Sequence, residues 1–330
     1  MSEEEKTQKQ KTAEEAKNLE TEAHPGPESE EPAEGKAQLA QEGTTTPAAG
    51  KSKKTVVIVV AVVAVIAIAA AAFWFVNVKM PYDNAVRSYN AAVASLDQKN
   101  SDLDAATADL TALSESEDKP LSDDVSTTVS DAIGKAQAAK ETAPDMPKET
   151  AAINAAASTI EAMGDYSEQL KAISDAKAEY EKSVKQMRQV TNPPEAFVIQ
   201  RVQSVPTVTG VEAVTEDNDP NGQLNKSGGY TACVYFTSSM VDLSDVSRSS
   251  KASTEIVAYG TDGGGAVEVF STADEAERRK EYLSAFDGTL FSLGSHEVVG
   301  TCVVRTSDKL TGSQQKEFTA NIIAALIELK

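Results

Sequence analysis

The longest apolar stretch of the chain runs from Val56 to Val76 and contains no charged or strongly polar side chain. A helix rises by about 1.5 Å per residue, so this stretch can cross a hydrocarbon layer of roughly 30 Å. It begins too far from the N-terminus, and is too long, for a secretory signal peptide. We therefore predict a membrane-spanning helix over residues 55–78, with Phe73 and Trp74 near its interfacial end.

Beyond the span, apolar residues recur at intervals of three and four, which predicts an α-helical stalk over residues 79–192. Its first helix places Asn100 in a seam of leucines, a pattern typical of a coiled coil. Breaks at 114–124 and 143–147 divide the stalk into three helices, the third over about 148–190. Two arrangements fit this pattern, an antiparallel three-helix bundle and an intermolecular coiled coil that would form a homo-oligomer. Proline and aspartate at the breaks favour the bundle.

Two prolines at 193 and 194 end the helical pattern and predict a separate module over residues 193–330. Strands are predicted at 211–215, 230–236, 255–260, 266–270 and 296–306, and helices at 195–203, 271–288 and 313–330. Strands that follow one another over hairpin-length connections are typical of an α+β sandwich with a mostly antiparallel sheet. In that arrangement the helices gather on one face of the sheet.

Residues 1–54 contain almost no aromatic or β-branched apolar side chains. Such a segment cannot bury enough apolar surface to fold, and we predict a disordered acidic tail. Lysines within 51–54 flank the N-terminal side of the span, whereas only Lys79 and Arg87 lie close to its other end. The positive-inside rule therefore predicts a cytoplasmic N-terminus and an extracytoplasmic C-terminal part.

The chain has a net charge of −20, and most of the excess acid lies beyond the span. Residues 79–330 contain 23 lysines and arginines against 39 aspartates and glutamates. An anionic surface repels phosphate backbones, so this part of the chain is not expected to bind nucleic acid. The anionic surface would attract cations or basic partners. The alternative is that the negative charge only keeps this part of the chain soluble.

The two cysteines, Cys233 and Cys302, both lie on the predicted extracytoplasmic side, within strand-like segments. In an oxidising compartment they can pair. Closing a loop of about 70 residues would stabilise the fold by roughly 4 kcal/mol on the chain-entropy model. The alternative is a pair of buried free thiols, and no C-x-x-C redox motif is present.

The stretch TEDNDPNGQLNKSGGY, residues 215–230, resembles the first half of a calcium loop. Asp217, Asp219 and Asn221 stand two apart and a glycine follows, which is the spacing of side-chain ligands in an EF-hand loop. The twelfth position is Gly228 instead of glutamate. Asx-rich turns have the same composition, so the three residues are a weak calcium candidate and no other cofactor is predicted.

Catalytic motifs are absent from the sequence. His296 is the only histidine outside the tail, and no G-x-S-x-G elbow accompanies it. The glycine run at 263–265 precedes a predicted strand and lacks the lysine of a phosphate-binding loop. We predict a non-catalytic protein, with an envelope hydrolase as the least favoured alternative.

Three stretches of the C-terminal part carry a family resemblance: PPEAFVIQRVQSVPTVTGVEAVTEDNDPNGQLNKSGGYTACVYF, TDGGGAVEVFSTADEAERRKEYLSAFDG and GSHEVVGTCVVRTSDKLTGSQQ. Over about residues 194–330 the chain resembles an extracytoplasmic module, without an assigned activity, of single-pass membrane-anchored proteins of Gram-positive bacteria. The resemblance implies one folded module outside the bacterial cell membrane and no particular ligand.

These observations predict a membrane-anchored cell-envelope protein that displays a binding or structural module on a helical stalk. Its expected partners are the membrane, through residues 55–78, and a cell-envelope component or another protein. The alternative is a membrane sensor or regulatory subunit that signals through the N-terminal tail.

Overall fold

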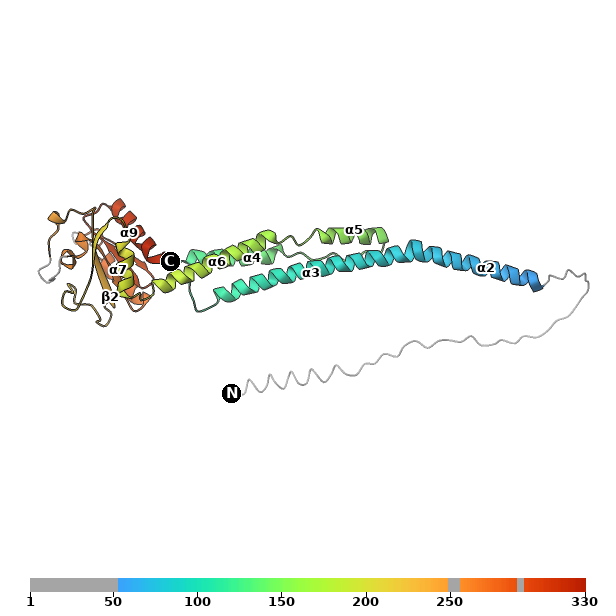
Figure 1. The fold of residues 1–330 in the computed structure, drawn as a ribbon, viewed down its shortest axis with the longest axis horizontal. Helices are drawn as coiled ribbons and strands as arrows, with labels where there is room; N and C mark the ends of the chain where they lie inside the picture. The colour runs from blue at the N-terminus through green and yellow to red at the C-terminus, as the bar shows by residue number, and fades with distance from the viewer. Residues whose placement is uncertain (1–52, 249–255, 290–293) are drawn as a thin grey trace, which may run out of the picture. The chain divides into compact units, whose positions relative to one another are not determined.

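The structure is a computed structural model that describes residues 53–248, 256–289 and 294–330 (Figure 1). All but the last two residues of the predicted disordered tail lie outside this description. The chain divides into two units, Met1–Ala67 and Ile68–Lys330. Within the described residues the fold is α+β, with eight α-helices and one five-stranded antiparallel sheet, which confirms the predicted fold class.

Helix α2, Lys53–Trp74, contains the predicted membrane span from residue 55 to residue 74, and the last four residues of the span lie in the next segment. The π-helical segment η1, Phe75–Lys79, and helix α3, Met80–Ser114, follow it directly. In the part of the chain that the structure describes, this run holds the one stretch that is long and apolar enough to cross a membrane. Its side chains from Val57 to Trp74 are exposed, as expected of a surface that lipid would cover.

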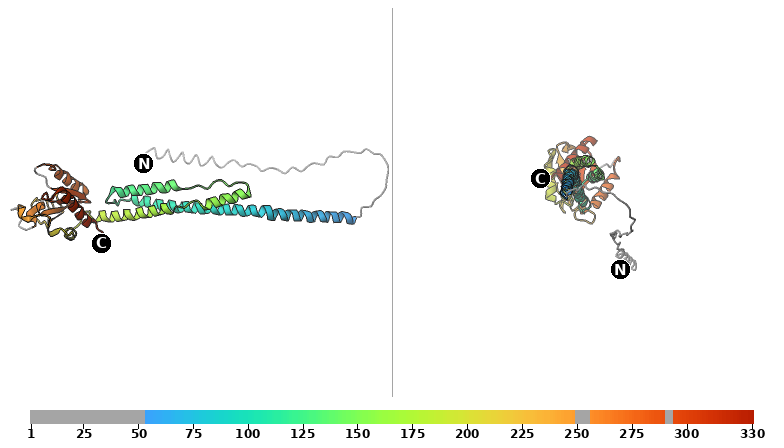
Figure 2. Two further views of the ribbon diagram at one scale, coloured as in Figure 1. Left: turned by 90° about the horizontal axis from the view of Figure 1, so that it is seen from above. Right: turned by 90° about the vertical axis from the view of Figure 1, so that its right-hand side faces the viewer.

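Three further helices pack against α3, namely α4 (Asp123–Ala139), α5 (Thr150–Glu161) and α6 (Ser167–Gln189) (Figures 1 and 2). One apolar cluster joins α5 to the N-terminal half of α3, and another joins α4 and α6 to its C-terminal half. The predicted third helix is therefore two helices. Gly164 separates them with a φ of +72°, a conformation that ends a right-handed helix.

Asn100, the polar residue predicted in the leucine seam, finds its partners within the same chain. Its Oδ1 accepts a hydrogen bond from the Tyr166 hydroxyl at 2.6 Å, and its Nδ2 donates to the Glu141 carbonyl at 3.0 Å. The Tyr166 hydroxyl accepts in turn from the Glu141 amide at 2.9 Å. Asn100 is half-buried, and these bonds connect α3 to the segments on either side of α5.

The C-terminal module contains three helices and the sheet. The helices are α7 (Glu195–Gln203), α8 (Ala273–Ser284) and α9 (Gly312–Ile327). The strands are β1 (Val208–Ala213), β2 (Ala232–Ser238), β3 (Gly264–Val269), β4 (Ser295–Val299) and β5 (Cys302–Thr306). The strand order is β1-β2-β3-β5-β4, so β3 lies at the centre.

Helices cover both faces of the sheet, which corrects the expectation that they gather on one. Val234 and Phe236 of β2 lie in one apolar cluster with residues of α7 and α9. Cys233 and Tyr235 of the same strand lie in another cluster with residues of α8. Every residue of β2, β3 and β5 is buried, and strands that are buried on both faces need a layer on each side.

Two of the predicted strands differ in the structure. The segment predicted at 255–260 contributes instead to a 3₁₀ helix, Val257–Gly263, which bends at Gly260 with a φ of +60°. The segment predicted as one strand at 296–306 is the hairpin β4–β5. Gly300 and Thr301 form its two-residue turn, and Gly300 has a φ of +60°, which glycine adopts without strain.

The two cysteines are free thiols, and the predicted disulfide is not formed. In the register of the sheet Cys233 lies opposite Glu268, whereas Cys302 lies opposite the next residue, Val269. Successive residues of a strand point to opposite faces. Cys233 therefore lies on the α8 face and Cys302 on the α7/α9 face, so the two sulfur atoms cannot meet.

The end of α6 is bonded to the last two elements of the module, and we call this contact the α6 junction. The Thr301 amide donates to the Val190 carbonyl at 3.0 Å, and the Asn192 amide donates to the Thr301 hydroxyl at 2.7 Å. Side-chain amides on α6 also cap the C-terminal carbonyls of α9. Gln186 donates to Ile327 O at 3.1 Å, and Gln189 donates to Leu326 O at 2.6 Å and to Glu328 O at 3.0 Å.

Candidate functional site

The long loop between β1 and β2 is organised around Asp219. One carboxylate oxygen accepts from the Asn221 amide at 2.9 Å and from the Tyr230 hydroxyl. The other accepts from the amides of Gln223 and Leu224 at 2.6 and 2.8 Å. Burial alone would raise the pKa of Asp219, but the hydrogen bonds from Tyr230 and the loop amides outweigh burial and lower it.

These bonds give Asp219 the role of a turn residue. Asp217 is exposed, and the side chain of Asn221 donates to the Tyr235 hydroxyl at 3.2 Å. Within the residues that the structure describes, no three histidine, cysteine or carboxylate side chains converge as a metal-binding group. A calcium ion on Asp219 would have to displace hydrogen bonds that hold the loop.

Replacing Asp219 with asparagine is expected to destabilise the loop by about 1–3 kcal/mol, because loop donors lose their charged acceptor. Hydrogen exchange of the amides of residues 221–230 should become faster. Asp217→Asn makes the same charge change at an exposed position and should leave exchange unaltered. Millimolar calcium is not expected to raise the melting temperature; a rise that Asp219→Asn abolishes would contradict this role.

The structure brings His296 close to a serine and an aspartate, although not in a catalytic arrangement. Nε2 of His296 lies 2.9 Å from Ser284 Oγ and 3.5 Å from Asp287 Oδ2. In a Ser-His-Asp triad the carboxylate holds the other ring nitrogen, Nδ1. Here Nδ1 is buried without a partner among the described residues. The Ser284 hydroxyl donates its proton to the Lys280 carbonyl at 2.9 Å. The serine oxygen therefore accepts a hydrogen bond from His296, and His296 cannot take the serine proton as a general base would.

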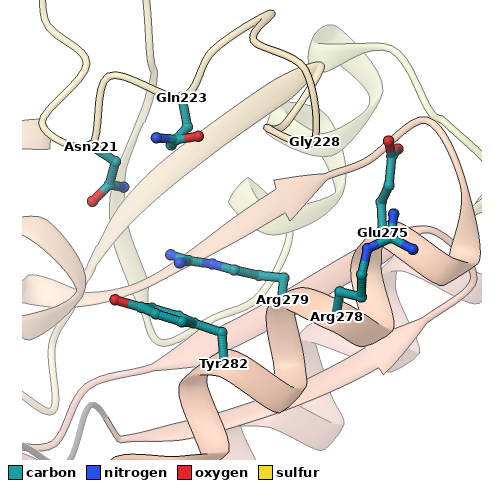
Figure 3. A pocket seen from close by; sticks show the side chains of 7 residues that line it. All are labelled: Asn221, Gln223, Gly228, Glu275, Arg278, Arg279 and Tyr282. Atoms are coloured by element: carbon teal, nitrogen blue, oxygen red, sulfur yellow. The ribbon is translucent and has the colours of Figure 1, made fainter.

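An open pocket of about 370 Å³ lies between the β1–β2 loop and α8, and we call it the loop–α8 pocket (Figure 3). It is lined by Asn221, Gln223 and Gly228 of the loop and by Glu275, Arg278, Arg279 and Tyr282 of α8. In Figure 3, Arg279 and Tyr282 extend from α8 toward the side where Asn221 and Gln223 hang from the loop. Two elements separated by about 50 residues of sequence thus form one site.

Arg279 is held in place by a buried carboxylate. Its Nε and Nη2 donate to Glu268 of β3 at 2.7 and 2.8 Å, and Arg305 of β5 donates to the same carboxylate at 2.8 Å. Glu268 is fully buried, and the Arg305 side chain is 7% exposed. Burial opposes the charged form of each group, but the carboxylate–guanidinium contacts outweigh it, lowering the pKa of Glu268 and raising that of Arg279.

Of the three calcium candidates from the sequence, Asn221 alone lines this pocket, and the sequence analysis did not single out the residues of α8. Arg278, Arg279 and Lys280 are the only adjacent basic residues within 193–330, a segment with 11 lysines and arginines against 19 aspartates and glutamates. That contrast is the signal that could have identified the site. A second signal is that Glu268 and Arg305 each occupy an inward position of an otherwise apolar strand.

The side chains that line the pocket are charged, amide and aromatic groups. Its lining combines two guanidinium groups, two side-chain amides, one carboxylate and one phenol ring, and contains no histidine, cysteine or serine. Arginine in such a setting pairs with carboxylate or phosphate oxygens. Comparison of the chain with protein-family models, with curated proteins and with solved structures gives no match.

Proposed function

We propose that the chain is a single-pass membrane protein of the bacterial cell envelope that displays a non-catalytic binding module outside the cytoplasm. The membrane anchor is residues 55–78, and the module is residues 193–330. The lysines at 51–54 support a cytoplasmic N-terminus. The observation that carries the proposal is an open, arginine-lined pocket on a module that follows an apolar helix of membrane-spanning length.

We also propose that residues 79–192 form a stalk within one chain instead of an intermolecular coiled coil. The apolar residues of α3 from Ala85 to Leu110 that face the other helices are buried against α4, α5 and α6. The Asn100 side chain bonds to Tyr166 and Glu141 of the same chain, so it does not need hydrogen-bond partners from the α3 helix of a second copy. The stalk then acts as a spacer that holds the module away from the membrane surface.

The orientation and the binding role are tested together. Protease added to intact spheroplasts is expected to digest residues 79–330 and to spare an epitope placed within residues 1–54. Full-length protein in detergent micelles is expected to retain purified cell-envelope material. Protection of the module from external protease, or failure of the full-length protein to retain any envelope fraction, would refute the proposal.

The α6 junction favours one alternative, a membrane sensor. Bonds from Val190 and Gln189 tie the stalk directly to the module, so a change in the module can reach the stalk without crossing a flexible linker. Deleting residues 1–54 separates the two functions. A sensor would lose its downstream response, whereas a display protein would keep its envelope binding unchanged.

A further inference from the structure

The loop–α8 pocket lies against a largely buried charge group in which two arginines share one carboxylate. Glu268 is the carboxylate shared by Arg279 and Arg305, so this largely buried group of three carries one unit of positive charge. The neighbouring Cys233 thiol adds no negative charge, because burial raises its pKa. Keeping a charge away from water without a counter-ion is costly, and an anion in the pocket would offset that cost.

Two guanidinium groups are available to such an anion. Arg279 uses Nε and Nη2 for Glu268, which fixes the plane of the group and leaves Nη1 without a bonded partner in the described part of the chain. Arg278 is exposed and has no ion pair or hydrogen bond among the same residues. Guanidinium N–H groups match the paired oxygens of a carboxylate, and a fixed guanidinium loses little side-chain entropy on binding.

The remaining lining groups suit a hydroxyl-rich ligand better than a bare anion. Gln223 and the free Oδ1 of Asn221 offer a donor and acceptors for hydroxyl groups. Oε2 of Glu275 is buried and has no hydrogen-bond partner among the described residues, so it reaches a ligand hydroxyl only if the side chain turns into the pocket; its charge opposes a bare anion. Tyr282 is 57% exposed and gives the pocket an apolar wall against which a ring can lie.

We infer that the loop–α8 pocket binds a carboxylate-bearing sugar, with Arg278 and Nη1 of Arg279 on the carboxylate and Tyr282 beside the sugar ring. The inference rests on the proposed function, and it identifies the ligand of the binding module as an acidic saccharide of the cell envelope. It explains why positive charge, amides, a carboxylate and an aromatic ring occur in one pocket of an acidic module.

The test titrates the full-length protein in detergent micelles with soluble probes of matched length. They are an oligogalacturonate, an uncharged oligogalactose, a glycerol-phosphate oligomer and an oligoglutamate peptide. Oligogalacturonate is expected to bind at least about tenfold more tightly than each of the others, since the others lack either the carboxylate or the sugar ring. Isothermal titration calorimetry gives the dissociation constants.

Variants locate the binding. Arg278→Gln is expected to weaken oligogalacturonate binding by about tenfold or more, and it leaves the fold intact because Arg278 is exposed and unbonded. Tyr282→Ala should weaken it by a similar factor. Lys280→Gln is the matched control: it removes the same charge from the same helix, outside the pocket lining, and should change the dissociation constant by less than about twofold.

Several outcomes would overturn the inference while leaving the proposed function in place. Equal weakening by Arg278→Gln and Lys280→Gln would indicate diffuse electrostatic attraction. Equal or tighter binding of the phosphate oligomer, the peptide or the uncharged sugar would assign another ligand class. The inference is also overturned if the full-length protein retains envelope material but does not bind oligogalacturonate. It is overturned as well if the Arg278→Gln variant retains envelope material as well as the wild type does.

Discussion

Replacing Glu268 with glutamine is expected to lower the free energy of unfolding by about 3–5 kcal/mol. Glutamine keeps the shape of the side chain but removes the carboxylate charge that is paired with both Arg279 and Arg305. Arg305 is almost fully buried and lies on the central part of the sheet, so its charge cannot turn toward water without disturbing β5. Thermal unfolding of the full-length protein in detergent, followed by calorimetry, measures the loss.

Glu277→Gln is the matched control for this prediction. Glu277 lies on α8 near Arg279 in sequence but is exposed, and exposed substitutions usually change stability by less than about 0.5 kcal/mol. If the two variants melt at the same temperature, the buried carboxylate does not hold the module together. A double variant that also replaces Arg305 with methionine should recover part of the loss, because methionine removes one of the two buried charges that glutamine leaves without a counter-charge.

The same carboxylate makes stability depend on pH. Burial alone would raise the pKa of Glu268, but Arg305 and Arg279 lower it below the ordinary value. Because the folded pKa lies below the unfolded pKa of about 4.3, the stabilisation is complete above that pH and is lost as pH falls through the folded pKa. The difference in the free energy of unfolding between wild type and Glu268→Gln should therefore shrink at acid pH.

Replacing Gly300 with alanine is expected to destabilise the module by about 3 kcal/mol and to open the α6 junction. Gly300 has a φ of +60°, which costs an L-residue about 1–2 kcal/mol. A Cβ at this position would also lie 2.5 Å from the carbonyl oxygen and from Cγ2 of Val190, and relieving that overlap costs a further 1–3 kcal/mol or so. Hydrogen exchange at the Thr301 amide, which donates to Val190, reports the opening directly.

Gly222→Ala isolates the backbone part of that effect. Gly222 has a similar φ of +65°, but a Cβ there would meet nothing within 4 Å. The Gly222→Ala variant should lose only about 1–2 kcal/mol of the free energy of unfolding, and hydrogen exchange at the Thr301 amide should stay unchanged. If Gly300→Ala and Gly222→Ala behave alike, the contact with Val190 does not contribute to stability.

Much of the helical part of the fold could be predicted, because its signals are periodic and local. The apolar run from Val56 to Val76 predicted α2, and prolines 193 and 194 predicted the gap between α6 and α7. Left-handed glycines account for the misplaced elements: Gly164 divides a helix, Gly300 divides a strand and Gly260 lies in a bend. A sequence does not reveal which glycines have a positive φ, because glycine is also common where φ is negative.

The candidate site was predictable only in part for a different reason. The Asx pattern at Asp217, Asp219 and Asn221 indicated a turn-rich loop. The role of Asp219 also depends on a hydrogen bond from Tyr230, and the pattern does not reveal that the two side chains meet. The pocket further requires that α8 cross the same face of the sheet as Glu268. That pairing is a tertiary contact, and spacing along the chain does not encode it directly.

The α6 junction has a consequence for how the protein is made. Val190 bonds to a residue 111 positions later, and Gln186 bonds to one 141 positions later, near the C-terminal end. Synthesis proceeds from the N-terminus, so α6 leaves the ribosome long before its partners do. The attachment between spacer and module is therefore completed only after the final helix has emerged. A chain that stops short of α9 would keep the bond between Thr301 and Val190 but would leave the side-chain amides of Gln186 and Gln189 without their partners on α9.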